Sequence, residues 1–196
     1  MVYSLGYKPA GSSYPNAELV EGPRELVVED QTADGGIHVN VEPGLSGRRI
    51  KPESVARVIR RFGRRRLLDF EGQFVATVND RFRRLIEEIE PGIHQFEPVR
   101  YIGRDDELLE ERWFWQVCNR LDTVDRERSN GEIRRVTYGP RKGVPMRVVF
   151  NLEAIGRAKF WCDKHYTPGR LITDEVHERL IAERVTGLQY HRYEQA

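Results

Sequence analysis

The stretch from Val78 to Asp125 constrains the fold more than any other part of this sequence. Asn79 stands where a short polar side chain can cap a helix. Beyond it, apolar residues recur at the spacing of one helical face: Phe82, Leu85, Ile86 and Ile89. Pro91 and Gly92 end this pattern, and residues 93–102 and 112–118 are apolar enough for two strands around a charged turn at 103–107. The stretch therefore predicts a capped helix followed by a β-hairpin.

The rest of the chain alternates short apolar runs with turn-forming residues. We predict two further helices over residues 52–62 and 173–185, the first starting at Pro52 and carrying Val55, Val58, Ile59 and Phe62 on one face. Further strands are predicted over residues 2–7, 25–29, 36–41, 67–70, 133–138, 146–150, 158–166 and 188–193. The order strand, cap, helix, glycine, strand occurs twice, at 78–96 and 172–190.

These elements predict an α+β fold, a mostly antiparallel sheet with a few packed helices and two similar helix–strand units. At 196 residues the chain suits one domain. We divide it into residues 1–70, with the N-terminal strands and the arginine-rich helix, and residues 71–196, an α+β part of the same domain. The 39% hydrophobic content is enough for a core.

Composition and cysteine usage indicate a cytoplasmic protein. No window approaches the roughly 18 apolar residues that a membrane-spanning helix needs, and the first residues do not resemble a secretory signal. Two cysteines, Cys118 and Cys162, are too few for a disulfide scaffold, and both follow apolar, strand-like runs. We expect both to be reduced and structural.

A formal net charge of +1 hides an uneven distribution. From Arg48 to Arg66 nine basic residues face one acidic residue, Glu53. On a helix over this segment (52–66) the solvent face would carry Arg57, Arg60, Arg61 and Arg64. Such a face could neutralise phosphates, so a nucleic-acid-binding module is one hypothesis. The alternative is that these arginines pair with acidic residues elsewhere, and near-neutral overall charge makes nucleic acid the less favoured partner.

Signals for an enzyme are weak, because the sequence lacks a phosphate-binding glycine loop, a G-x-S-x-G motif and an H-E-x-x-H motif. Cys162 and His165 are three residues apart, but on a strand they would point to opposite faces. Cys118 with His94 could form a nucleophile pair, although the preceding aromatic run would bury the thiol. We expect no catalytic residues, no metal and no cofactor.

Several segments together resemble a known family. They are N-D-R-F-R-R-L-I-E at residue 79, P-G-I-H-Q-F-E-P-V at 91, W-Q-V-C-N-R-L-D-T-V-D at 115, L-I-T-D-E-V-H-E-R-L at 171 and T-G-L-Q-Y at 186. This order is similar to immunity family eleven of bacterial polymorphic-toxin systems, formerly a domain of unknown function. The resemblance runs from about Phe74 to Tyr193, and residues before 71 match weakly.

The resemblance implies a cytoplasmic, non-catalytic protein that binds and neutralises the toxin encoded by an adjacent gene. We expect a monomer or a homodimer, and no membrane as a partner. Two surfaces compete for that contact. The predicted hairpin carries an acidic end and neighbouring tryptophans: Asp105, Asp106, Glu107, Glu110, Glu111, Trp113 and Trp115. A projecting acidic end could enter a basic cleft, and exposed tryptophans are frequent binding anchors. The second surface is the basic face of the helix at 52–66. Solvated charges and core tryptophans are the alternative for both.

Overall fold

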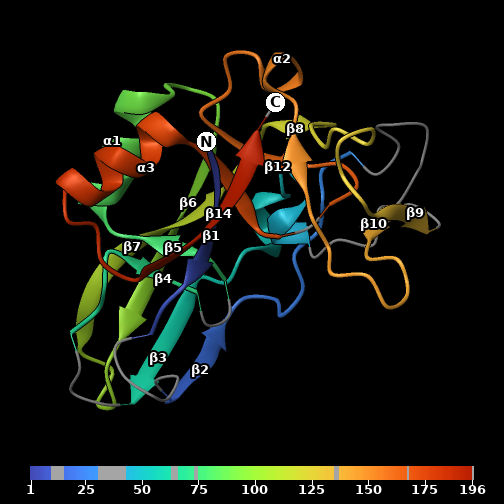
Figure 1. The fold of residues 1–196 in the computed structure, drawn as a ribbon. Helices are drawn as coiled ribbons and strands as arrows, with labels where there is room; N and C mark the ends of the chain where they lie inside the picture. Colours follow the sequence, from blue (N-terminus) through green and yellow to red (C-terminus); the bar gives the residue numbers. More distant parts are fainter. Residues whose placement is uncertain are drawn as a thin grey trace.

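A computed structural model describes residues 1–9, 16–30, 43–62, 66–72, 75–134, 137–166 and 168–195. Strands and a few helices make an α+β fold, as predicted (Figure 1). The strands form two six-stranded sheets and one small hairpin, which joins β9 (Glu132–Arg134) to β10 (Thr137–Gly139).

The two large sheets are mixed, with antiparallel pairs in the majority. The first has the order β11 (Val149–Phe150), β14 (Leu188–Gln195), β1 (Val2–Tyr7), β13 (Arg170–Thr173), β12 (Phe160–Asp163) and β8 (Arg120–Leu121). The second has the order β2 (Asn16–Glu21), β3 (Val58–Phe62), β6 (Gln95–Ile102), β7 (Leu108–Gln116), β5 (Thr77–Val78) and β4 (Phe70–Glu71).

The repeated helix–strand pattern corresponds to two units of the same topology. In one, helix α1 (Asp80–Ile89) connects β5 to β6, and both strands pair antiparallel with β7, which lies between them. In the other, helix α3 (Asp174–Ala182) connects β13 to β14 around β1. Each helix has an N-cap side chain, Asn79 or Thr173, that accepts a hydrogen bond from the backbone N–H three residues later.

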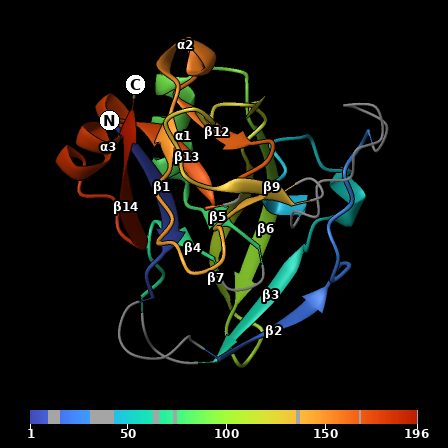
Figure 2. The ribbon, with the colours of Figure 1, turned by 45° about the vertical axis from the view of Figure 1, so that its right-hand side comes forward.

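The main core lies where the two units meet, and α1 and α3 run side by side over it (Figures 1 and 2). It takes Phe82 and Ile86 from α1, Val176 and Leu180 from α3, and Trp115 from β7. Each sheet also has a second apolar face. Trp161 and Phe150 belong to the cluster on the first sheet, where helix α2 (Leu152–Ile155) contributes Ile155. Another cluster covers the second sheet and includes Ile50, Ile59 and Phe114.

The predicted helix over residues 52–62 is wrong. The segment begins with a short 3₁₀ turn at Pro52–Ser54 and continues as β3, which pairs with β2 on one side and β6 on the other. Val58 and Ile59 are both buried, on successive positions, because both faces of this strand are covered. β-branched residues suit such a strand as well as the apolar face of a helix, so their spacing did not decide between the two.

Two strand predictions also differ from the structure, and a third is not tested. Residues 25–29 form a single bridge between Val28 and Ile50 rather than a strand. The strand predicted over 133–138 is the hairpin of β9 and β10, and residues 36–41 lie outside the described residues. A second 3₁₀ turn occupies Pro43–Leu45. The hairpin predicted from residue 93 onward is present, with β7 beginning four residues earlier than expected.

Candidate interaction surface

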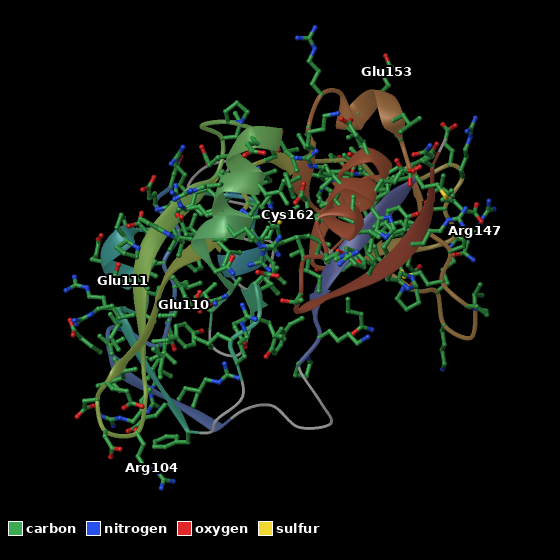
Figure 3. The ribbon with its side chains drawn as sticks, turned by 90° about the vertical axis from the view of Figure 1, so that its left-hand side faces the viewer. Arg104, Glu110, Glu111, Arg147, Glu153 and Cys162 are labelled. Carbon is green, nitrogen blue, oxygen red and sulfur yellow. The ribbon has the colours of Figure 1, made fainter. Side chains whose placement is uncertain are left out.

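The hairpin of β6 and β7 projects from the second sheet, away from the two helices, with Arg104 at its end (Figure 3). Its turn is closed by a hydrogen bond from the Gly103 N–H to the Glu107 carbonyl oxygen at 2.8 Å. The Glu107 carboxylate accepts from the Asp105 N–H at 3.0 Å, and Asp106 takes a left-handed backbone conformation with φ 61°. The sequence therefore forms a tight turn with its acidic side chains on the outside.

The five predicted acidic residues lie on this hairpin but not in one cluster. Asp105, Asp106 and Glu107 are exposed around the turn. Glu110 is half-buried and pairs with the buried Arg112 at 2.8 Å, whereas Glu111 is exposed and stands opposite Arg100 of β6. Figure 3 shows Glu110 and Glu111 along the strand, well above the hairpin end.

The two predicted surfaces are in contact with each other. Arg60 of β3 donates to Asp106 at 2.6 Å and to Glu18 of β2 at 3.1 Å. These hydrogen bonds, Asp106 first, raise the pKa of the Arg60 guanidinium. A residue assigned to the basic surface thus neutralises part of the acidic one.

The remaining predicted arginines do not make a basic face. Arg61 is buried, and its guanidinium lies 3.3 Å from the Glu71 carboxylate. Arg57 is exposed and lies 3.8 Å from Glu21, while Arg64 lies outside the described residues. Because the segment is a strand, Arg60 and Arg61 point to opposite sides of the sheet. The helical basic face that was predicted is therefore not formed.

The two predicted tryptophans have different environments. Trp115 has no exposed surface and makes edge-to-face contacts with Phe82 and Phe160, with ring centroids 5.7 and 5.6 Å apart. Its assignment to a partner-binding surface is therefore wrong. Trp113 is half-buried, and the Arg83 guanidinium lies over its ring at 4.7 Å. Both side chains face α1, so helix packing decides how much of each remains exposed.

Two concavities adjoin the hairpin. One, of about 600 Å³, is lined by Glu111 and Trp113 together with Arg57 and Arg100. The other, of about 890 Å³, lies beside β7, and we call it the β7 groove. Its lining residues are Arg66, Leu67, Leu68, Asp69, Asn79, Arg81, Glu107, Leu109, Glu110, Arg184 and Thr186. Leu108 and Leu109 next to it are 56% and 43% exposed. The acidic residues around these leucines were predicted as part of a binding surface, whereas the exposure of the leucines was not predicted.

The His94 and Cys118 pair has the geometry of a structural contact. His94 Nδ1 accepts from the Cys118 backbone N–H at 3.3 Å, and the Cys118 thiol donates to the Gln116 carbonyl at 3.4 Å. Burial raises the pKa of the Cys118 thiol, which disfavours the nucleophilic thiolate. Cys162 and Cys118 are both free thiols, and the described residues contain no group of three or more side chains suited to hold a metal ion.

The Glu90 carboxylate connects His94 and Asn119 to strand β12 of the first sheet. Its carboxylate accepts from His94 Nε2 and Asn119 Nδ2, each at 3.0 Å, and from the backbone N–H groups of Lys159 and Phe160 at 3.2 and 3.1 Å. Desolvation alone would raise the pKa of Glu90, but these hydrogen bonds together lower it. Position 90 is an acid at a helix end, and nothing local in the sequence pointed to this role.

Asp69 forms the other buried link. Its carboxylate accepts from the Thr186 N–H and hydroxyl and from Arg81, all at 2.8 Å, and from Asn79 at 2.7 Å. Burial opposes ionisation, yet the donors lower the pKa of Asp69. Its partners lie more than 100 residues apart in the chain, so sequence periodicity carries no signal for it.

Glu90 and Asp69 link the two sheets through hydrogen bonds, and the hairpin of β6 and β7 is exposed next to two concavities. A family model, the immunity protein family (Imm11), matches residues 16–195. The chain belongs to this family. No curated protein matches the chain.

The family match starts at residue 16, whereas the resemblance predicted from the sequence starts at about residue 74. The match therefore includes β2 and β3. Several residues of the segments that carry the resemblance have partners inside the molecule. His94 and Asn119 hold Glu90, and Gln95 exchanges hydrogen bonds of 2.8 Å with the backbone of Ile50 in both directions. These three residues therefore stabilise the fold.

Proposed function

We propose that this protein binds a cognate bacterial toxin and neutralises it by stoichiometric protein–protein inhibition. The observation that carries the proposal is membership of an immunity family over almost the whole chain. An inhibitor of this kind needs affinity and surface complementarity rather than catalysis, and the internal roles of Glu90, His94 and Cys118 agree with that. The toxin is expected to be encoded by an adjacent gene.

The hairpin of β6 and β7 is the proposed contact. Residues 104–111 carry five carboxylates against one arginine, Arg104, and they flank two exposed leucines. Apolar anchors within a charged rim are the usual composition of a specific interface. Trp113 and the concavity next to Glu111 extend this surface along the strand.

The hypothesis of a nucleic-acid-binding module loses its premise. It required a helical face of four arginines, and of these Arg61 is buried against Glu71 and Arg60 bridges two carboxylates. We place the protein in the cytoplasm as part of the same proposal, since both cysteines are free thiols. None of the described helices is long and apolar enough to cross a membrane.

Co-expression with the product of each adjacent gene tests this function. We expect one of these products to stop growth when expressed alone, to permit growth with this protein, and to co-elute with it in size-exclusion chromatography at a fixed ratio. The elution volume of this protein alone distinguishes a monomer from a homodimer. Failure of every neighbouring product to form a complex, together with unchanged toxicity, would contradict the proposal.

A further inference from the structure

Strand β7 has an unpaired edge over its first half. Along one side it pairs with β6 through its whole length, from Gln116 back to Leu108. Along the other side β5 covers only Trp113 and Phe114, and Trp115 donates to the Ala76 carbonyl at 2.8 Å. From Leu108 to Arg112 no described strand lies on that side, because the chain after Val78 turns into helix α1.

The register shows which backbone groups point to this edge. The Arg100 N–H donates to Arg57 of β3 at 2.8 Å, so it points away from β7. Arg100 stands opposite Glu111. In an antiparallel pair both members of such a position turn their N–H and C=O groups outward. The Glu111 N–H and carbonyl therefore face the open side of β7, in the same direction as those of Trp115.

The outer edges of the two hairpin strands differ in their ability to pair with another strand. Pro98 lies two residues before Arg100 in β6, so its backbone nitrogen points to the same outer side. Strand β3 does not cover Pro98, and proline has no N–H to offer at this uncovered position. Proline at an edge prevents pairing with another chain. The sequence of β7 has no proline from Leu108 to Gln116, so its outward N–H groups remain able to pair.

The β7 groove lies along this open edge. Leu109, Glu107 and Glu110 form its strand side, and Leu67 and Leu68 lie on the opposite wall. The exposed Leu108 and Leu109 are unusual on an edge strand, where charged residues normally discourage association. Strand β14 also has an open outer edge before Glu194, but it carries exposed Gln189, His191 and Arg192 in place of leucines.

We propose that an extended segment of the toxin pairs with the open edge of β7 and continues the second sheet, with its apolar side chains against Leu108 and Leu109. Basic side chains of the same segment would reach the exposed carboxylates of Asp105 and Glu107 at the hairpin end. This is strand addition, in which main-chain hydrogen bonds give affinity and side chains give selectivity. The inference rests on the proposed function and names the contact it uses.

A pair of substitutions at one position separates main-chain pairing from side-chain contact. Glu111→Pro removes the outward N–H without breaking a hydrogen bond to β6, and Glu111→Ala removes the carboxylate and keeps the N–H. Binding of each variant to the toxin that forms the complex is measured by calorimetric titration. We expect Glu111→Pro to weaken binding at least about tenfold and Glu111→Ala by less than about threefold. Equal effects of the two variants would overturn strand addition.

Amide hydrogen exchange of the wild-type protein keeps the test valid if Glu111→Pro does not fold. The Glu111 amide should exchange faster than the Arg112 amide in the free protein, because only the latter points to β6, and should become protected in the complex. A Glu111 amide that stays unprotected in a stable complex would overturn strand addition and leave the proposed function intact. If no neighbouring toxin binds, the proposed function and strand addition both fail. If the protein alone dimerises and Glu111→Pro abolishes this, the occupant is a second copy and not the toxin.

Discussion

The two helix–strand units share a topology but differ at their central strands. Strand β1 is covered on both sides, by β13 from Val2 to Leu5 and by β14 from Val2 to Tyr7. Strand β7 extends five residues past the end of β5 and continues into an exposed hairpin. The same unit thus has a central strand paired on both sides at β1 and a central strand with an open edge at β7.

This difference separates scaffold from binding surface within one chain. Strand β1 itself has a paired neighbour on both sides from Val2 to Leu5. Around β7 the backbone edge, two leucines and several carboxylates remain on the surface. The two units cannot separate, because they share the main core and are linked by Asp69 and Glu90. We therefore expect mutations in the shared core to affect both units and mutations on the hairpin to affect binding alone.

Trp115→Ala should have the largest effect. The indole lies in the shared core against Phe82 of α1 and Phe160 of β12, so its loss leaves a cavity between the units and should lower the free energy of unfolding by about 3–5 kcal/mol. Urea denaturation followed by fluorescence and by circular dichroism measures it. The two probes should give one coincident transition, and two separate transitions would show that the units unfold independently.

Arg61→Ala should come next, at about 3 kcal/mol, because it leaves the Glu71 carboxylate buried without its charged partner. Arg57→Ala is the matched control on the same segment. Its side chain is 61% exposed, so we expect a change below about 0.5 kcal/mol. Thermal or urea denaturation checks both. Similar small effects would mean that Arg61 belongs to a solvated basic surface, as the nucleic-acid hypothesis required.

The features predicted correctly from the sequence are those that depend on neighbouring residues. Helices α1 and α3 have a cap, a periodic apolar face and a terminating signal within about 15 residues, and the hairpin has a charged turn between apolar runs. The segment at 52–62 failed because its apolar spacing fits a helix, while pairing with β2 and β6 made it a strand. Trp115 is buried because α1 and β12 cover it. The edge of β7 is open because β5 ends at Val78. Such tertiary contacts have no local signature.

Acid should weaken the links between the two units. The pKa of Glu90 is lowered in the folded protein, so its ionised form contributes stability that is complete above the ordinary glutamate pKa of about 4.3 and is lost as the pH falls through the folded value. Glu90→Gln should cost about 1–3 kcal/mol near neutral pH by weakening four hydrogen bonds. It should also flatten the decline of stability below about pH 4. Unfolding free energies of both proteins across this range test it, and parallel curves would exclude Glu90 as a source of the decline.

The smallest effect on stability is expected where the effect on binding is clearest. Replacing Leu108 and Leu109 by serine removes apolar side chains that are already about half exposed, so stability should change by less than about 1 kcal/mol. Toxin affinity should fall about tenfold or more if these side chains anchor the complex. Ile181→Ser is the control, since Ile181 is similarly exposed, at 54%, but lies on α3 of the other unit. Calorimetric titration of both variants with the toxin shows which of the two units carries the binding surface. A loss of affinity with Ile181→Ser and not with the leucine variant would move the binding surface to α3.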